Sequence, residues 1–191
     1  MPVQRVASQP VRKSVPKSVP KTTPACPWLD LDATGAGLSV DDFITTVTSR
    51  TANALRRSIT VPYADGHGLS VSQWRLLSVL AEAREMSFAD LVVASVSDKA
   101  MVSRTLRLLQ ERGWVQVDHQ GSNPRWKQIV CRITPAGQAL HRKVMPQARQ
   151  AQAAMILRLS PEERVTVYRA LKMLRAIGEA LEAASDDSVA E

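Results

Sequence analysis

The feature that most restricts the fold is a basic helical segment followed at once by two segments of alternating pattern. Residues 98–112 place apolar side chains at helical spacing, and Gly113 suits the left-handed conformation that ends a helix. Residues 114–117 and 126–133 alternate in the manner of strands, and the Gln-Gly-Ser-Asn-Pro run at 120–124 favours a turn between them. We therefore predict a helix that leads directly into a β-hairpin.

Three helical patterns precede this unit. The first covers residues 38–58 and has acidic residues in its first turn, and Pro62 predicts a loop after it. Ser70 is a suitable cap for a helix over residues 71–81, and residues 88–94 form a shorter helical pattern. The order of elements is helix, helix, helix, basic helix and hairpin, which is the order of a winged helix-turn-helix.

Two helices are predicted after the hairpin. Thr134 and the proline that follows it indicate a helix start, and apolar spacing continues to Leu159, with a kink expected at Pro146. Ser160 and Glu163 have the spacing of a capping box and begin the last helix. The expected fold class is mostly α with a small β-hairpin wing.

Positive charge is concentrated in two segments of the 191-residue chain. Residues 1–27 carry five cations and no anion, and residues 99–149 carry ten cations against two anions. The intervening residues 28–98 and the final residues 150–191 are both net acidic. A charge maximum on the basic helix and hairpin is the electrostatic pattern expected of a nucleic-acid partner, although a solvated charged face would also produce it.

Other classes of protein fit the sequence poorly. No stretch approaches the roughly 18 apolar residues of a membrane span, and no signal sequence is readable, so we expect a cytoplasmic protein without a membrane partner. His67, His119 and His141 are scattered, and no phosphate-binding glycine loop or nucleophile motif is present. We therefore expect no enzyme activity, catalytic residue, cofactor or metal site.

The basic helix presents two faces. Val102, Leu106 and Leu109 share the face expected in the core, so the polar and small residues project elsewhere, where they suit the major groove of DNA. Cations of the hairpin can reach the adjacent minor groove or its phosphates. The candidate DNA contacts are Ser97, Lys99, Ala100, Met101, Ser103, Arg104 and Arg107, with Arg125 and Lys127 on the hairpin.

Four short motifs follow one another between residues 69 and 137. They are Ser-Gln-Trp-Arg-Leu-Leu at 72–77, Asp-Leu at 90–91, Asp-Lys-Ala-Met-Val-Ser-Arg at 98–104 and Ile-Thr-Pro-Ala-Gly at 133–137. Together they resemble the MarR family of bacterial regulators. The resemblance implies a homodimer with interlocked terminal helices that reads the half-sites of a palindrome.

One position departs from the family pattern. Members often carry an Asp-x-Arg unit at the wing, and its two slots here hold Arg125 and Lys127. The acid is missing, so the usual ion pair within the domain is not expected, whereas both cations remain for DNA.

The last helices carry more apolar surface than a small winged domain needs, which independently favours a dimer. Half-sites would then lie about one DNA turn apart, ~34 Å. The expected divisions are a disordered basic Pro/Lys-rich tail (1–27), an N-terminal dimerisation helix (38–62), a winged helix-turn-helix (69–134) and C-terminal dimerisation helices (135–184).

The resemblance also suggests a repressor that a small phenolic or aromatic carboxylate releases from DNA. An arginine can bind a carboxylate with two hydrogen bonds, and aromatic rings can stack on the ligand. Arg50 and Arg56 are candidates for this contact, although surface residues or salt bridges between the subunits of a dimer are equally compatible with the sequence. The candidate ligand residues are Arg50, Arg56, Tyr63, His67 and Trp74.

Two alternatives stay open at this point. Some members of the family sense oxidants through a cysteine near the first helix, and this chain has Cys26 and Cys131. A winged helix used only for contacts with proteins is the other alternative. The salt dependence of DNA binding distinguishes this module from a DNA-binding protein. DNA binding weakens steeply as the salt concentration rises, whereas a protein-only module would not bind DNA even at low salt.

Overall fold

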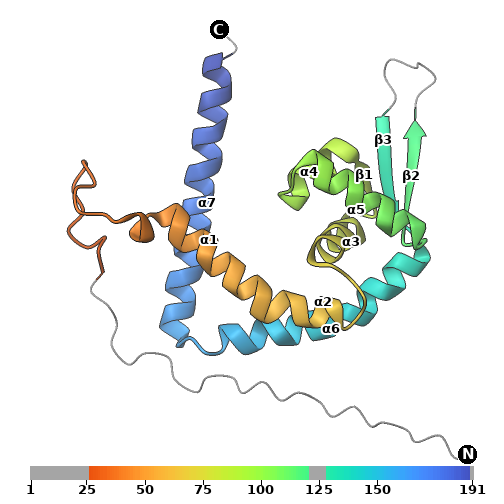
Figure 1. Cartoon of the computed structure of the whole chain (residues 1–191), viewed down its shortest axis with the longest axis horizontal. Helices are drawn as coiled ribbons and strands as arrows, with labels where there is room; N and C mark the ends of the chain where they lie inside the picture. Colours follow the sequence, from red (N-terminus) through yellow and green to blue (C-terminus); the bar gives the residue numbers. More distant parts are fainter. Residues whose placement is uncertain (1–25, 121–127, 190–191) are drawn as a thin grey trace, which may run out of the picture. The chain divides into compact units, whose positions relative to one another are not determined.

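The computed structural model describes residues 26–120 and 128–189 (Figure 1). The chain divides after Thr48 into two compact units, and each is described separately. In the first unit the indole Nε1 of Trp28 donates to the carbonyl of Asp42 at 2.8 Å. The short 3₁₀-helix η1 (Val40–Asp42) follows Ser39, and Phe43 then takes an extended conformation before helix α1 (Ile44–Leu55). The predicted helix start at residue 38 is therefore wrong by six residues, because Phe43 separates η1 from α1.

Helical backbone continues beyond α1 through a π-helical turn, η2 (Arg56–Thr60), into α2 (Val61–Asp65). The loop predicted at Pro62 is therefore wrong, because Pro62 occupies the first turn of α2. A proline ring clashes with the carbonyl four residues earlier in a regular α-helix, and a π-turn widens the backbone at that place. The sequence pattern did not reveal this local change of helix type.

The helix-turn-helix lobe contains α3 (Val71–Ala83), α4 (Phe88–Ser95) and α5 (Lys99–Glu111). Strands β2 (Val115–Gln120) and β3 (Gln128–Ile133) form the predicted antiparallel hairpin (Figure 1). A third strand, β1 (Glu85–Ser87), pairs with the other edge of β3, so the sheet order is β1-β3-β2. The sequence analysis did not predict β1, which has only three residues.

Helix α3 contributes to both hydrophobic clusters of the second unit. Its Trp74 and Leu77 pack with residues of η2, α2 and α6, whereas Leu76 and Leu80 pack with α4, α5 and the sheet. Helix α3 therefore connects α4, α5 and the sheet with the helices on its other side. The core residues predicted for the basic helix, Val102, Leu106 and Leu109, are all buried.

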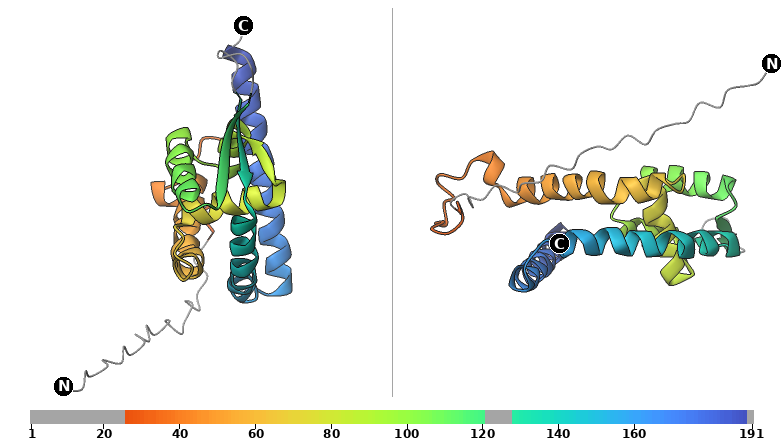
Figure 2. Two further views of the ribbon diagram at one scale, coloured as in Figure 1. Left: turned by 90° about the vertical axis from the view of Figure 1, so that its right-hand side faces the viewer. Right: turned by 90° about the horizontal axis from the view of Figure 1, so that it is seen from below.

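Helix α6 (Pro135–Ile156) runs along η2 and α2 (Figure 2), and α7 (Pro161–Val189) follows it. The predicted caps are confirmed, because the Thr134 hydroxyl accepts from the Gly137 amide at 3.1 Å and Ser160 forms its capping box with Glu163. Pro146 lies inside the continuous helix α6. No helix in residues 26–120 and 128–189 is long and apolar enough to cross a membrane.

Candidate nucleic-acid interface and ligand cavity

Helix α5 carries an exposed polar row opposite its buried face. The buried side chains are Val102, Thr105, Leu106 and Leu109, while the other side chains of the first two turns face solvent. Arg107 forms an exposed ion pair of 3.6 Å with Glu111, a type of pair that contributes little to stability. The predicted contacts that are exposed on α5 are Lys99, Ala100, Met101, Ser103, Arg104 and Arg107.

The turn between α4 and α5 fixes where the exposed row begins. Val96 has a φ of 49°, a left-handed conformation that is strained for a β-branched residue. The Ser97 hydroxyl donates to the carbonyl of Ser95 at 3.1 Å, and Asp98 caps α5 by accepting from the Met101 amide at 2.8 Å. Ser97 is therefore half-buried, and its hydroxyl is engaged inside the turn.

The base of the wing is held by an arginine on the central strand. Arg132 on β3 pairs with Glu85 on β1 and, at 2.6 Å, with Asp118 on β2. These carboxylates raise the pKa of the Arg132 guanidinium, with Glu85 making the larger contribution. The sheet thus has an ion-pair cluster that joins all three strands. Arg125 and Lys127, the predicted wing contacts, lie outside the described residues.

Arg112 uses part of the positive charge of this region in contacts within the chain. Its Nη1 donates to the carbonyl of Gly68 at 2.7 Å, and its guanidinium lies 5.0 Å from the centre of the Trp114 ring. Arg112 therefore ties the end of α5 to the loop before α3. Arg112 and Arg132 are therefore two central cations that are engaged within the fold, whereas Lys99, Arg104 and Arg107 are exposed on α5.

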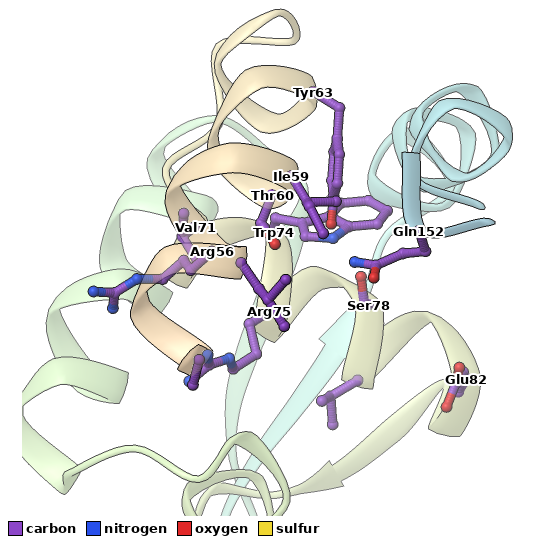
Figure 3. Close-up of a pocket in the computed structure, with 13 residues that line it drawn as sticks. Arg56, Ile59, Thr60, Tyr63, Val71, Trp74, Arg75, Ser78, Glu82 and Gln152 are labelled. Carbon is purple, nitrogen blue, oxygen red and sulfur yellow. The ribbon is translucent and has the colours of Figure 1, made fainter. Parts of the chain in front are cut away.

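A cavity of about 450 Å³ lies on the other side of α3 (Figure 3). Arg56 and Arg75 lie on one side of it, and Ser78, Glu82 and Gln152 lie on the other. This size is within the range of small-ligand sites, which combine apolar walls with a few polar groups. The other lining residues are Ala52, Leu55, Ile59, Thr60, Tyr63, Val71, Trp74 and Val79.

Trp74 forms a rigid aromatic wall of this cavity. Tyr63 meets its ring edge-on with 5.8 Å between centroids, and His141 stacks on it at 5.3 Å with planes 17° apart. Burial lowers the pKa of His141, although Glu82 opposes that shift, so the ring favours its neutral form at pH 7. Rings packed in this way hold Trp74 in one orientation, which suits a flat ligand.

The cavity brings together three of the five predicted ligand residues. Arg56, Tyr63 and Trp74 line it, and the Arg56 guanidinium also donates to Asn53 at 2.7 Å. Arg50 and His67 are not among the lining residues, and the His67 ring hydrogen-bonds to Gln147 of α6 at 2.9 Å.

Sequence reasoning missed polar lining residues that α3 and α6 supply. Arg75 follows Trp74 directly, and Ser78 lies one turn further along α3. The Ser78 Oγ is buried and has no hydrogen-bond partner among the described residues, so it can bond to a water or to a ligand group. Ser78 lies at i+4 from Trp74, a spacing that places two side chains on one helix face and could have indicated it, whereas Arg75 and Gln152 line the cavity only through tertiary packing.

The cysteines differ in environment. Cys26 is exposed, and Cys131 is buried in β3, where loss of solvation raises the pKa of its thiol to about 11. A thiolate is the reactive form of cysteine, so Cys131 is poorly suited to sensing oxidants. No group of three histidine, cysteine or acidic side chains in the described part of the chain could hold a metal ion.

We expect iodoacetamide to alkylate Cys26 in the folded protein at pH 7 and to leave Cys131 unmodified. Peptide mass spectrometry after a timed reaction would measure both sites, and unfolding in guanidinium should make Cys131 react as well. Rapid labelling of Cys131 in the native protein would contradict the buried, protonated thiol.

Comparison with known proteins agrees with this geometry. A sequence profile of the MarR family matches residues 67–122, and no curated protein matches the chain. The solved structure of Bordetella bronchiseptica BpsR, described as regulated in its DNA binding by 6-hydroxynicotinic acid, is 22% identical with a TM-score of 0.63 and covers 72% of this chain and 96% of its own.

Two other solved structures show the same likeness. NadR in complex with 4-hydroxyphenylacetate is 20% identical with a TM-score of 0.59, covering 72% of this chain and 95% of its own. AbsC, a MarR family transcriptional regulator from Streptomyces coelicolor, is 21% identical with a TM-score of 0.60, covering 75% and 97%. The predicted mostly helical fold with a small antiparallel wing sheet is confirmed. Residues 67–122 are therefore similar in sequence to the MarR family, and the chain has the winged helix-turn-helix fold of these solved structures.

Proposed function

We propose that the protein is a homodimeric transcriptional repressor that binds a palindromic operator in double-stranded DNA and is released by a small aromatic or phenolic carboxylate. The single observation that carries this proposal is the exposed row on α5, which combines cations with small side chains beside a buried apolar face. A helix of this kind can enter the major groove, where cations bind phosphates and base edges.

The apolar surface of α7 supports a homodimer. Tyr168 is 65% exposed in the single chain, and Leu171, Ile177 and Leu181 follow on the same helix with half or more of their surfaces exposed. An apolar groove of about 500 Å³ lies between the end of α6 and the start of α7. Contiguous apolar surface of this kind is typical of an obligate interface, and a second copy would bury it.

The cavity supports an aromatic carboxylate as the effector. Arg56 and Arg75 provide positive charge on one side, Trp74 provides a flat apolar wall, and Ser78 provides an uncompensated hydroxyl. These groups complement a carboxylate, a ring and a polar substituent, in that order. The ligands named for NadR and BpsR, 4-hydroxyphenylacetate and 6-hydroxynicotinic acid, combine the same three chemical features.

Salt dependence tests the proposed DNA binding. We expect the affinity of the full chain for a random-sequence duplex of about 40 base pairs to fall by about 10³ between 50 and 200 mM NaCl, because each phosphate contact releases counterions. Fluorescence anisotropy would measure the affinities, and sedimentation would establish the dimer under the same conditions. A folded protein that ignores the duplex at 50 mM NaCl would instead favour the protein-only module.

A further inference from the structure

Arg75 is shared between the cavity and the DNA-binding lobe. It lines the cavity from α3, and its Nη1 also donates to the backbone carbonyl of Ser95, the last residue of α4, at 3.4 Å. No other cavity-lining residue described by the structure has a recorded hydrogen bond to α4, α5 or the turn between them. This one guanidinium therefore lies within reach of an effector and of the helix-turn-helix.

The Ser95 carbonyl lies at the turn that joins α4 to α5. It accepts a second hydrogen bond, from the Ser97 hydroxyl at 3.1 Å, and the next residue, Val96, has the strained left-handed conformation. The strained turn sets where α5 begins, because Asp98 caps that helix two residues later. A cation at the end of α4 also compensates the negative end of the helix dipole. Arg75 thus braces the turn from which the exposed row of α5 starts.

We propose that Arg75 is the positioning residue through which the effector releases DNA: a carboxylate in the cavity draws the guanidinium away from Ser95 and loosens the turn before α5. This inference rests on the proposed function of the cavity. At 3.4 Å the bond to Ser95 is long for an N–H···O hydrogen bond and therefore weak. The Ser95 carbonyl carries no net charge, whereas a carboxylate carries a full negative charge and can accept two parallel, shorter bonds from the guanidinium, so it wins the competition.

The test compares the full chain with its Arg75→Met variant, which keeps an unbranched side chain and loses every donor. The probes are 4-hydroxyphenylacetate, 6-hydroxynicotinate and benzoate, each at a concentration that calorimetry shows to be saturating for that protein. In the wild type, the best-binding probe is expected to weaken binding to a duplex selected from a random pool by at least tenfold. In Arg75→Met, the saturated and free proteins should differ by less than twofold.

Hydrogen exchange gives a second measurement that does not depend on DNA. The probe should accelerate exchange in peptides covering residues 95–101 of the wild type. Without any probe, Arg75→Met should already show the faster exchange and a DNA affinity about threefold lower, because one bond to the turn is lost.

Two control variants separate the possible failures. Arg56 lines the same cavity, but its guanidinium bonds to Asn53 and not to Ser95. The Arg56→Gln variant should therefore bind the probe more weakly and, once saturated, lose as much DNA affinity as the wild type does. Ser72→Ala removes a polar side-chain contact between α3 and α5, a hydroxyl 3.8 Å from the Met101 sulfur, and should also keep the effect. A full effect retained by Arg75→Met at saturation would overturn the relay and leave the cavity intact. Failure of all three probes to bind the wild type would reject the proposed effector site and the relay with it.

Discussion

The Gly137→Ala variant is expected to lose about 3 kcal/mol or more of unfolding free energy, because its new methyl group has no space. A Cβ at Gly137 would overlap the carbonyl oxygen of Trp114 and approach Cγ1 of Ile133 to 2.9 Å. The Trp114 carbonyl also accepts from the Thr134 amide at 3.0 Å, so it cannot move without breaking the junction between α6 and the wing sheet. Thermal unfolding at a fixed protein concentration should show a Tm lower by about 10 °C.

Ala136→Val is the matched control, because it adds carbon atoms at the adjacent, exposed position of the same helical turn. Its cost should stay near the difference in helix propensity, about 0.5 kcal/mol. Equal stability of Gly137→Ala and the wild type would mean that α6 does not pack against the Trp114 backbone as the structure places it.

The elements that the sequence predicts well are those whose ends are set by nearby residues. Ser70 begins α3 with a complete capping box involving Gln73, Thr134 caps α6, and Gly113 has the expected positive φ of 70°. Each of these signals acts within three residues, so it is readable without knowledge of the tertiary structure. The buried face of α5 is predictable for a similar reason, since its apolar spacing repeats over three turns.

The elements that the sequence analysis missed depend on distant partners or on local backbone adjustment. Strand β1 forms by pairing with residues 130–132 of β3, which are distant in the chain, and its three residues carry too little alternation to reveal a strand. Pro62 is a turn signal in most sequences, but the preceding π-turn makes room for its ring. Both cases are decided by packing rather than by propensity.

The candidate functional residues also differ in how well the sequence predicts them. The exposed residues of α5 were predictable because one helix supplies them, whereas the cavity is assembled from η2, α2, α3 and α6. Arg50 and Arg56 are the same residue type on one predicted helix, so the sequence gives no reason to prefer either as a ligand residue, yet of the two Arg56 alone lines the cavity. Arg75 was not selected because its bond to Ser95 crosses twenty residues of sequence.

Arg104→Ala is expected to weaken binding to a selected operator duplex by at least 30-fold. Arg104 is exposed in the second turn of α5, on the face opposite the core. An arginine that contacts a base or phosphate contributes about 1–3 kcal/mol, and a homodimer would lose that contribution in both half-sites. Alanine is a good helix former, so the variant should fold with an unchanged Tm. Fluorescence anisotropy at about 100 mM NaCl would measure the affinity.

Lys143→Ala on α6 is the control, because it removes the same charge from an exposed position outside the helix-turn-helix. If the charge of the whole protein governed binding, both variants would lose affinity equally; if α5 lies in the groove, Lys143→Ala should stay within threefold of the wild type. The dependence of affinity on salt then distinguishes the role of Arg104. A phosphate contact lowers affinity for all sequences and reduces the salt slope by about one for each half-site, whereas a base contact relaxes the preference at one operator position. A dimer of Arg104→Ala that binds as tightly as the wild type would exclude this face of α5 from the DNA interface.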